Sequence, residues 1–142
     1  MKRRVLWLVA AVSLLGALAA AAEFDLVAFV KGALPVAENV VSALKVGDYQ
    51  RAVRDFDSRM RAALPAEKLK ATQEMQVKPI IGEILSYAFS TLTLDGNNVI
   101  VIYKLKCTRD DEAVVRVVFD KLDPTFRVGG LWIDSPRLRA AH

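Results

Sequence analysis

The strongest constraint on the fold is a strict alternation of side chains along residues 99–107. One set comprises Val99, Val101, Tyr103, Leu105 and Cys107, and the other comprises Ile100, Ile102, Lys104 and Lys106. This period of two sends successive side chains to opposite faces of a sheet. Further apolar runs lie at residues 84–94, 114–119 and 126–133. The sequence therefore predicts a four-strand antiparallel meander over residues 83–133.

The connections between these runs carry residues that are typical of turns. Residues 95–98 read Asp-Gly-Asn-Asn, a strong hairpin signal. Residues 108–112 are polar and charged, and residues 121–125 contain an Asp-Pro pair that favours a turn. In the last strand, Gly129 and Gly130 predict a bulge, or a point where another backbone or a bulky helix side chain approaches closely.

The segment before the sheet predicts helices. Residues 23–34 are expected to form a short opening helix, which Gly32 and Pro35 limit. Pro35 suits the first position of a second helix, and Gly47 suits the left-handed cap at its end.

The clearest amphipathic pattern covers residues 48–64, where Asp48 is the predicted cap. Apolar residues recur there at steps of three or four: Tyr49, Val53, Phe56, Met60 and Leu64. Such spacing predicts one helix with an apolar stripe, and we expect this helix to lie under the sheet. Its other face is interpreted as a solvated surface with local ion pairs, since nearly every amphipathic helix has one.

A third helix is predicted over residues 65–77. Its apolar stripe, Leu69 and Met75, is thin, so the helix should lie at the surface. We expect it to end before Pro79, which has no amide to donate, and Gly82 should turn the chain into the sheet.

These elements predict the α+β class, with N-terminal helices packed against a curved four-strand antiparallel meander. Both faces of the two middle strands carry apolar side chains, among them Ile100, Ile102, Val114 and Val118. Two explanations stay open for the second face: a second copy of the chain covers it as a homodimer through the sheet, or strong curvature shields it.

Residues 1–22 have the pattern of an export signal. A positive start, Lys2, Arg3 and Arg4, precedes an apolar stretch and three alanines that end at Ala22. We expect cleavage after Ala22 and a periplasmic or extracellular bacterial protein. The alternative is a retained membrane anchor, because the uncharged stretch is only slightly shorter than a bilayer span of roughly 20 residues.

Charge and cysteine content narrow the function classes. Without residues 1–22 the chain has 17 Lys and Arg against 16 Asp and Glu, a net charge of +1. It lacks the basic stripe with interleaved aromatics that nucleic-acid binding requires. Cys107 is the only cysteine, so no intramolecular disulfide can form. We expect it to be a small buried hydrophobe, and the alternative is an intermolecular disulfide.

Several short motifs in order resemble the domain of unknown function 3887 family. They comprise Gly47-Asp48-Tyr49, Phe56-Asp57, Met60, Leu64-Pro65, Leu69, Gly82, Val118-Phe119-Asp120, Gly130-Leu131 and Pro136. The resemblance covers residues 40–136 and implies a nuclear transport factor 2-like, cystatin-like cone. It divides the chain into a signal peptide (1–22), a helical lead-in (23–39), the domain (40–136) and a C-terminal tail (137–142).

The resemblance implies no catalytic residues. Family members occur as lone exported domains and ahead of α/β-hydrolase domains, but this chain has no Gly-x-Ser-x-Gly motif and its one histidine is His142. We therefore expect an exported, non-catalytic domain of unknown role that binds a small apolar ligand or a protein partner, such as a hydrolase. The candidates to line the cone between helix and sheet are Tyr49, Phe56, Met60, Tyr87, Phe89, Tyr103, Phe119 and Trp132, and the alternative for all eight is ordinary core.

A rival hypothesis is a small cofactor-independent enzyme of the isomerase or dehydratase kind. It needs a buried carboxylate with a raised pKa beside a phenol. The nominal pairs are Asp55, Asp57 or Asp120 with Tyr103 or Tyr87. No cofactor, metal or nucleic-acid partner is expected, and a membrane is expected only if the signal is retained.

Overall fold

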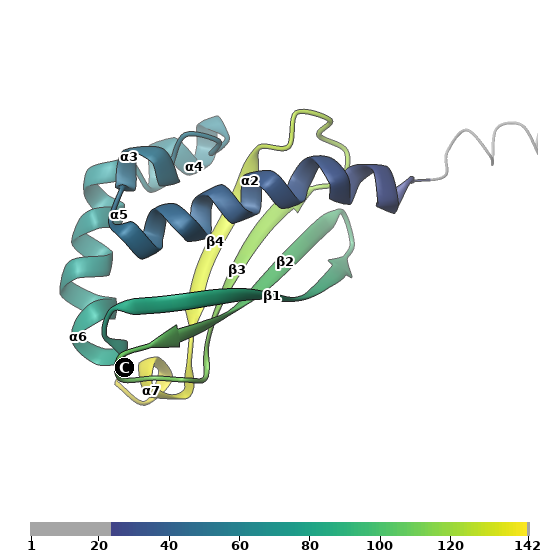
Figure 1. Ribbon diagram of the computed structural model, residues 1–142. Helices are drawn as coiled ribbons and strands as arrows, with labels where there is room; N and C mark the ends of the chain where they lie inside the picture. Colours follow the sequence, from purple (N-terminus) through teal and green to yellow (C-terminus); the bar gives the residue numbers. More distant parts are fainter. Residues whose placement is uncertain (1–23, 142) are drawn as a thin grey trace, which may run out of the picture.

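A computed structural model describes residues 24–141 of the chain. The predicted signal peptide, residues 1–22, and the terminal His142 lie outside the described residues. The elements follow in the order α2 (Leu26–Val46), α3 (Tyr49–Ala52), α4 (Ser58–Ala63), α5 (Ala66–Thr72), η1 (Gln73–Val77), α6 (Lys78–Ile81), β1 (Ile84–Asp95), β2 (Asn98–Cys107), β3 (Ala113–Asp120), β4 (Val128–Asp134) and α7 (Pro136–Ala140). Helices are followed by an open antiparallel sheet, so the predicted α+β class is confirmed (Figure 1).

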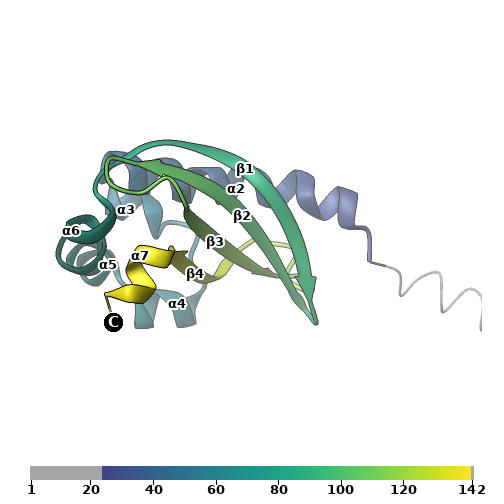
Figure 2. The same ribbon diagram turned by 90° about the horizontal axis from the view of Figure 1, so that it is seen from below.

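The sheet is a meander in the order β1-β2-β3-β4, as the turn signals predicted. Asp95 pairs with Asn98 at the first hairpin, and Gly96 takes a positive φ of 59° there. All five residues of the first alternating set in β2 are buried, while the second set is half-buried or exposed. The sheet is strongly curved, and α2 crosses its inner face (Figure 2).

Helix α2 is one continuous helix of 21 residues, so the prediction of two helices separated at Pro35 is wrong. Asp25 caps its start and Gly47 its end, the latter with φ 74° as predicted. Pro35 lies inside the helix, where the loss of one backbone hydrogen bond is offset by burial of residues on both sides of it, such as Ala33 and Val40.

Gly32 also lies inside α2, where it has a packing role. A Cβ at this position would overlap the ring of Phe126, a residue of the β3–β4 connection. This ring packs edge-on against Phe29, with 5.2 Å between the two ring centroids. Phe126 adopts a φ of 56°, a conformation that bulky residues rarely take. The glycine therefore allows a distant loop to close onto the helix.

The single helix predicted over residues 48–64 is also wrong, because the segment forms two short helices, α3 and α4. Between them the chain pairs with β4: the amide of Asp57 donates to Val128 at 2.9 Å, and the amide of Val128 donates to Asp55 at 2.8 Å. Asp57 then caps α4. The helix that covers the sheet is therefore α2, and Phe56 is buried from a connecting segment.

The third helix does not end before Pro79. It runs through α5, the π-helical turn η1 and α6 to Ile81. Pro79 lies at the second position of α6, directly after the π-helical turn, and the helix continues past it to Ile81. Gly82 turns the chain into β1 with a φ of 85°, as predicted.

The glycine pair in β4 marks a real irregularity. The register between β3 and β4 shifts between Val118 and Phe119, opposite Gly129. A Cβ at Gly130 would overlap the indole of Trp132, so a strand side chain, and not a helix side chain, occupies the space above this glycine. Val118 beside it is 8% exposed. This part of the second sheet face is thus covered within one chain.

Two features concern the ends of the described chain. Length and composition make α2 compatible with a membrane span or a signal sequence, with a mean hydropathy of 1.4, although its inner side packs on the sheet. At the other end, the predicted tail contains α7, which Ser135 caps and Leu138 anchors in the core.

Candidate functional site

The structure does not gather the eight predicted ligand-binding side chains at one site. Four of them are buried in the core: Tyr49, Phe56, Tyr103 and Phe119. Two are partly buried against it, Met60 and Tyr87, and two are 51% and 57% exposed, Phe89 and Trp132. Most of these side chains are therefore packing residues, and Trp132 lies apart from the others at the far edge of the sheet.

Tyr103 is the centre of the one aromatic group among these candidates. The rings of Tyr87 and Phe89, both from β1, meet it edge-on with centroid distances of 6.0 Å. Burial raises the pKa of Tyr103 to about 12, with smaller contributions from the charges of Glu38 and Tyr87. Its phenol is therefore a poor proton donor at neutral pH.

Tyr49 has a structural hydrogen bond. Its hydroxyl donates to Glu74 Oε1 at 2.8 Å, and Lys78 donates to the same oxygen at 2.9 Å. Burial, followed by the hydrogen bond to Glu74, raises the pKa of Tyr49, while the contact with Lys78 lowers the pKa of Glu74. This contact joins α3 to η1 and α6.

The carboxylates that an enzyme would need are engaged elsewhere. Asp55 forms ion pairs with two arginines at 3.4 and 3.6 Å. Asp57 accepts a backbone hydrogen bond at the start of α4 at 2.7 Å, and Asp120 does so in the following turn at 2.9 Å. Within residues 24–141, no hydrogen bond joins any of them to Tyr87 or Tyr103.

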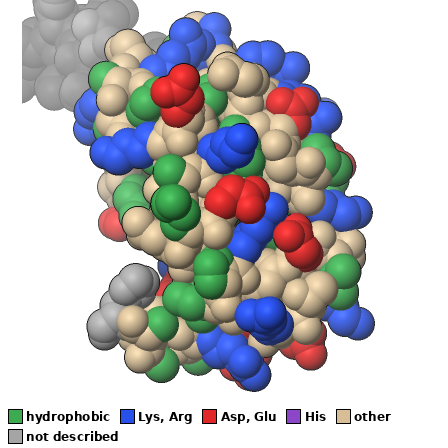
Figure 3. Space-filling model, turned by 90° about the vertical axis from the view of Figure 1, so that its left-hand side faces the viewer, with side chains coloured by type: hydrophobic (Ala, Val, Ile, Leu, Met, Phe, Trp, Pro, Cys, Tyr) green, Lys and Arg blue, Asp and Glu red, His purple; other side chains and the backbone are tan. Residues whose placement is uncertain are grey.

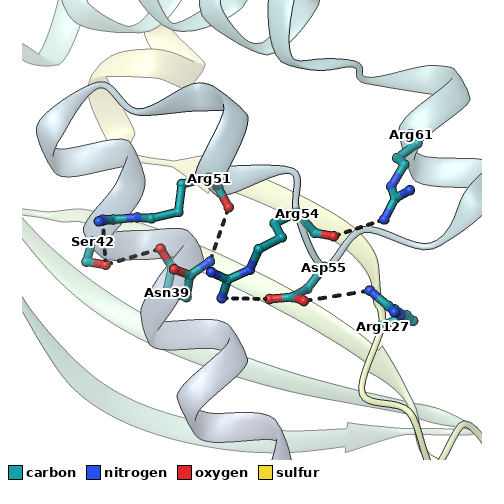
Figure 4. A network of polar contacts seen from close by, with 7 residues as sticks. All are labelled: Asn39, Ser42, Arg51, Arg54, Asp55, Arg61 and Arg127. Carbon is teal, nitrogen blue, oxygen red and sulfur yellow. Dashed lines mark hydrogen bonds and ion pairs between the residues drawn. The ribbon is translucent and has the colours of Figure 1, made fainter.

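Asp55 belongs to a polar network that ties α2, α3 and the β3–β4 connection together (Figure 4). Arg51 donates to Ser42 of α2 at 3.1 Å, and Asn39 donates to the backbone of Arg51 at 3.2 Å. Arg127 approaches Asp55 from the β3–β4 connection. These contacts hold the two short helices where the predicted long helix would have run.

The molecular surface has no broad area of one charge on the face formed by α5 and α6, where acidic and basic side chains are interspersed (Figure 3). An open cavity of about 550 Å³ beside the β2–β3 turn is likewise lined by both signs, including Arg109, Asp111 and Arg137. In the part of the chain that the structure describes, no group of three or more His, Cys, Asp or Glu side chains is arranged to hold a metal ion.

A smaller cavity between the third helix and β4 is mainly apolar. It has a volume of about 210 Å³ and is lined by Leu64, Leu69, Thr72, Gln73, Val77, Leu131, Trp132 and Ile133. Leu69 is 3% exposed and Trp132 is 57% exposed, so the cavity runs from the core to the surface. A second cavity of about 380 Å³ adjoins it and shares Val77 and Ile133.

Gln73 is the unusual member of this lining. It is only 4% exposed, and its Oε1 is buried without a hydrogen-bond partner among the described residues. It begins the π-helical turn η1, and such turns frequently occur at functional sites. Buried polar atoms are nearly always paired in native proteins. Asp110 Oδ2, at the cavity beside the β2–β3 turn, is also buried without a partner among the described residues, but that cavity is lined mainly by polar side chains. The apolar cavity beside Gln73 is therefore the better candidate for a site that binds an apolar ligand.

The sequence interpretation included Trp132 but missed Gln73. The predicted stripe of this helix was Leu69 and Met75, yet Met75 is 77% exposed and points to solvent. The inner positions are Leu69, Gln73 and Val77, spaced by four. A glutamine between two apolar residues at helical spacing was the available signal, because polar residues are usually exposed.

Comparisons with known proteins add no relative. No protein-family model matches the chain, and no curated protein or solved structure matches it significantly. The resemblance to the domain of unknown function 3887 family and the nuclear transport factor 2-like cone therefore stay predictions. The candidate site rests on its own geometry.

Proposed function

We propose that this domain is a non-catalytic binding module that holds a small molecule in the cavity between α5, η1 and β4. The ligand has a compact apolar body and one hydrogen-bonding group, as in an amide or an alcohol. The observation that carries the proposal is the buried, unpaired Oε1 of Gln73 beside an apolar cavity. This oxygen is closed off from the cavity that Gln73 lines, so the carboxamide must turn toward the cavity before its oxygen accepts from a ligand donor or its nitrogen donates.

The size of the site supports a small ligand. Typical ligand pockets have volumes of about 300–1,000 Å³, so the cavity of about 210 Å³ suits a compact molecule. The adjoining cavity of about 380 Å³ gives a longer ligand room toward α7. Its rim carries the ion pair of Arg139 with Asp134 at 2.8 Å, so a polar end would meet charged groups there.

Export belongs to the same proposal. The pattern of residues 1–22 supports a module that acts in the periplasm or outside the cell. The scarcity of catalytic features supports binding in preference to catalysis, since the nominal carboxylates cap helices, close turns or pair with arginines.

The test is a titration of the purified full-length protein with matched probes. Benzamide and hexanamide carry a hydrogen-bonding group, whereas ethylbenzene and heptane are apolar controls. Calorimetry follows the binding, because the indole of Trp132 lies over Gly130 on the second sheet face and Trp7 also contributes to the fluorescence of the full-length chain. We expect saturable binding of the amides and weaker binding of the apolar controls, because only the amides can satisfy Gln73.

Two variants locate the site. Leu64→Phe narrows the cavity and should weaken amide binding, whereas Leu122→Phe alters a 69% exposed side chain in the β3–β4 connection and should leave binding unchanged. The proposal is wrong if amides and apolar controls bind alike, if none of the probes binds, or if both variants behave in the same way.

A further inference from the structure

Strand β1 forms one edge of the sheet and has bulges, but it lacks the short length, charges and proline that protect many edges. It has 12 residues, about 40 Å of strand. Residues 84–94 contain no Lys, Arg, Asp, Glu or Pro. Natural edge strands are usually short, or carry charges or proline that prevent pairing with another chain. The opposite edge differs, because β4 has seven residues and pairs in part with the segment around Phe56.

The side chains of β1 are also unusually exposed for an apolar strand. Nine of its twelve residues are exposed, including Leu85, Phe89 and Leu94 at 51–52%. Tyr87 and Phe89 pack on Tyr103 at the inner face but leave part of their rings in solvent. An apolar, uncharged edge of this length favours a further strand beside it.

A bulge in β1 indicates which strand that is. The register with β2 shifts between Phe89 and Thr91, so the inner face is occupied by Tyr87 and Phe89 before the shift and by Leu92 and Leu94 after it. The inner positions thus change from odd to even numbers. A partner strand without a bulge would have its apolar side chains on the same face as those of β1 along only one half of β1, either before or after the bulge. A second β1, running antiparallel and carrying the same bulge, matches both.

We infer that β1 pairs antiparallel with β1 of a second copy about a two-fold axis at the bulge, which joins the two sheets into one. Residues 86–95 lie symmetrically about this point. Phe89 then faces Leu92 of the second copy, and Tyr87 faces Leu94, so apolar side chains meet on the inner face. The backbone groups of the edge gain hydrogen-bond partners at the same time.

The charges fit the same register. On the outer face Ser86 is opposite Asp95 of the second copy, and Lys106 of β2 is the neighbour of Ser86 on its other side. The serine is small, so the ammonium of Lys106 can reach toward the carboxylate across it. The two-fold axis repeats this contact, giving two attractive pairs per dimer.

The first test is the mass of the purified full-length protein by sedimentation velocity over a range of concentrations. We expect a monomer–dimer equilibrium. Phe89→Lys places a charge in the paired edge and should give a monomer, while Leu122→Lys, at an exposed position outside the sheet, should leave the dimer intact. A wild-type monomer at the highest soluble concentration, or an unchanged dimer in Phe89→Lys, overturns the inference.

Charge exchange tests the register without touching the apolar contacts. Asp95→Lys should weaken the dimer by repulsion from Lys106, and adding Lys106→Asp should restore it. Hydrogen exchange gives a second readout, since pairing at this edge slows exchange of β1 amides that point away from β2. A dimer broken by Ile102→Lys but not by Phe89→Lys uses the outer sheet face instead, and this result, or failure of the charge exchange to restore the dimer, overturns the inference.

Discussion

Replacement of Gln73 by methionine separates the cost of the unpaired carboxamide from its use in binding. Methionine has a similar length, is unbranched and has a similar helix propensity, so the packing of η1 should persist. Gln73 is 96% buried and one of its polar atoms lacks a partner. Such an atom costs about 1–3 kcal/mol. Because one atom is affected, we expect the variant to gain about 1–2 kcal/mol in free energy of unfolding.

Urea unfolding followed by circular dichroism measures this change. The urea concentration at the midpoint of unfolding should rise, while the slope of the free energy of unfolding against urea stays unchanged. The melting temperature should rise by roughly 4 °C per kcal/mol. Gln50→Met is the matched control, because Gln50 is an exposed residue of α3 and its replacement should change stability by less than about 0.5 kcal/mol.

The same variant should lose the preference for amides over apolar probes. A gain in stability together with a loss of amide binding is the signature of a residue kept for function. If Gln73→Met is less stable than the wild type by about 1 kcal/mol or more, the carboxamide has a partner in solution and the reasoning is refuted.

Other predictions concern packing and titration. Gly32→Ala should push the ring of Phe126 away from α2 and lower the free energy of unfolding, measured by urea unfolding, by about 1–3 kcal/mol. An unchanged free energy would contradict the close contact between Gly32 and Phe126. Because burial raises the pKa of Tyr103 from 10.0 to about 12, the unfolded state ionises first. The contribution of Tyr103 to the free energy of unfolding should therefore fall by up to about 1.4 kcal/mol per pH unit between about pH 10 and 12. Urea unfolding measured at several pH values in this range should show the fall in the wild type and lack this contribution in Tyr103→Phe. Burial also raises the pKa of the Cys107 thiol to about 11, so a thiol reagent at neutral pH should label it only in urea; rapid labelling of the native protein argues against its burial.

Local rules predicted the sheet well. The alternation in β2 and the turn at residues 95–98 depend on neighbouring residues alone, and both are present in the structure. The same holds for the caps at Gly47 and Asp48, whose geometry is set within one turn. Such features are fixed by steric preferences and short-range hydrogen bonds.

The candidate site could be predicted only in part. Trp132 and Leu69 were identified as apolar residues of the right elements, but the meeting of β4 with η1 joins segments far apart in the chain. Regular helical spacing places Gln73 and Val77 on the same side of the helix as Leu69, whereas Met75 points away from that side and is exposed. The spacing was thus present in the sequence, but the cavity that Gln73 lines exists only where this helix meets β4.

The sequence by itself determined the order of helices and strands, the register of the first hairpin and the burial of one face of β2. Only the tertiary structure decided that α2 continues through Pro35 and that residues 49–63 break to pair with β4. In both cases packing and hydrogen bonds from distant segments outweighed a local preference of a few kcal/mol. The position of Gln73 follows from the same competition, because its surroundings exist only once β4 has closed against the helix.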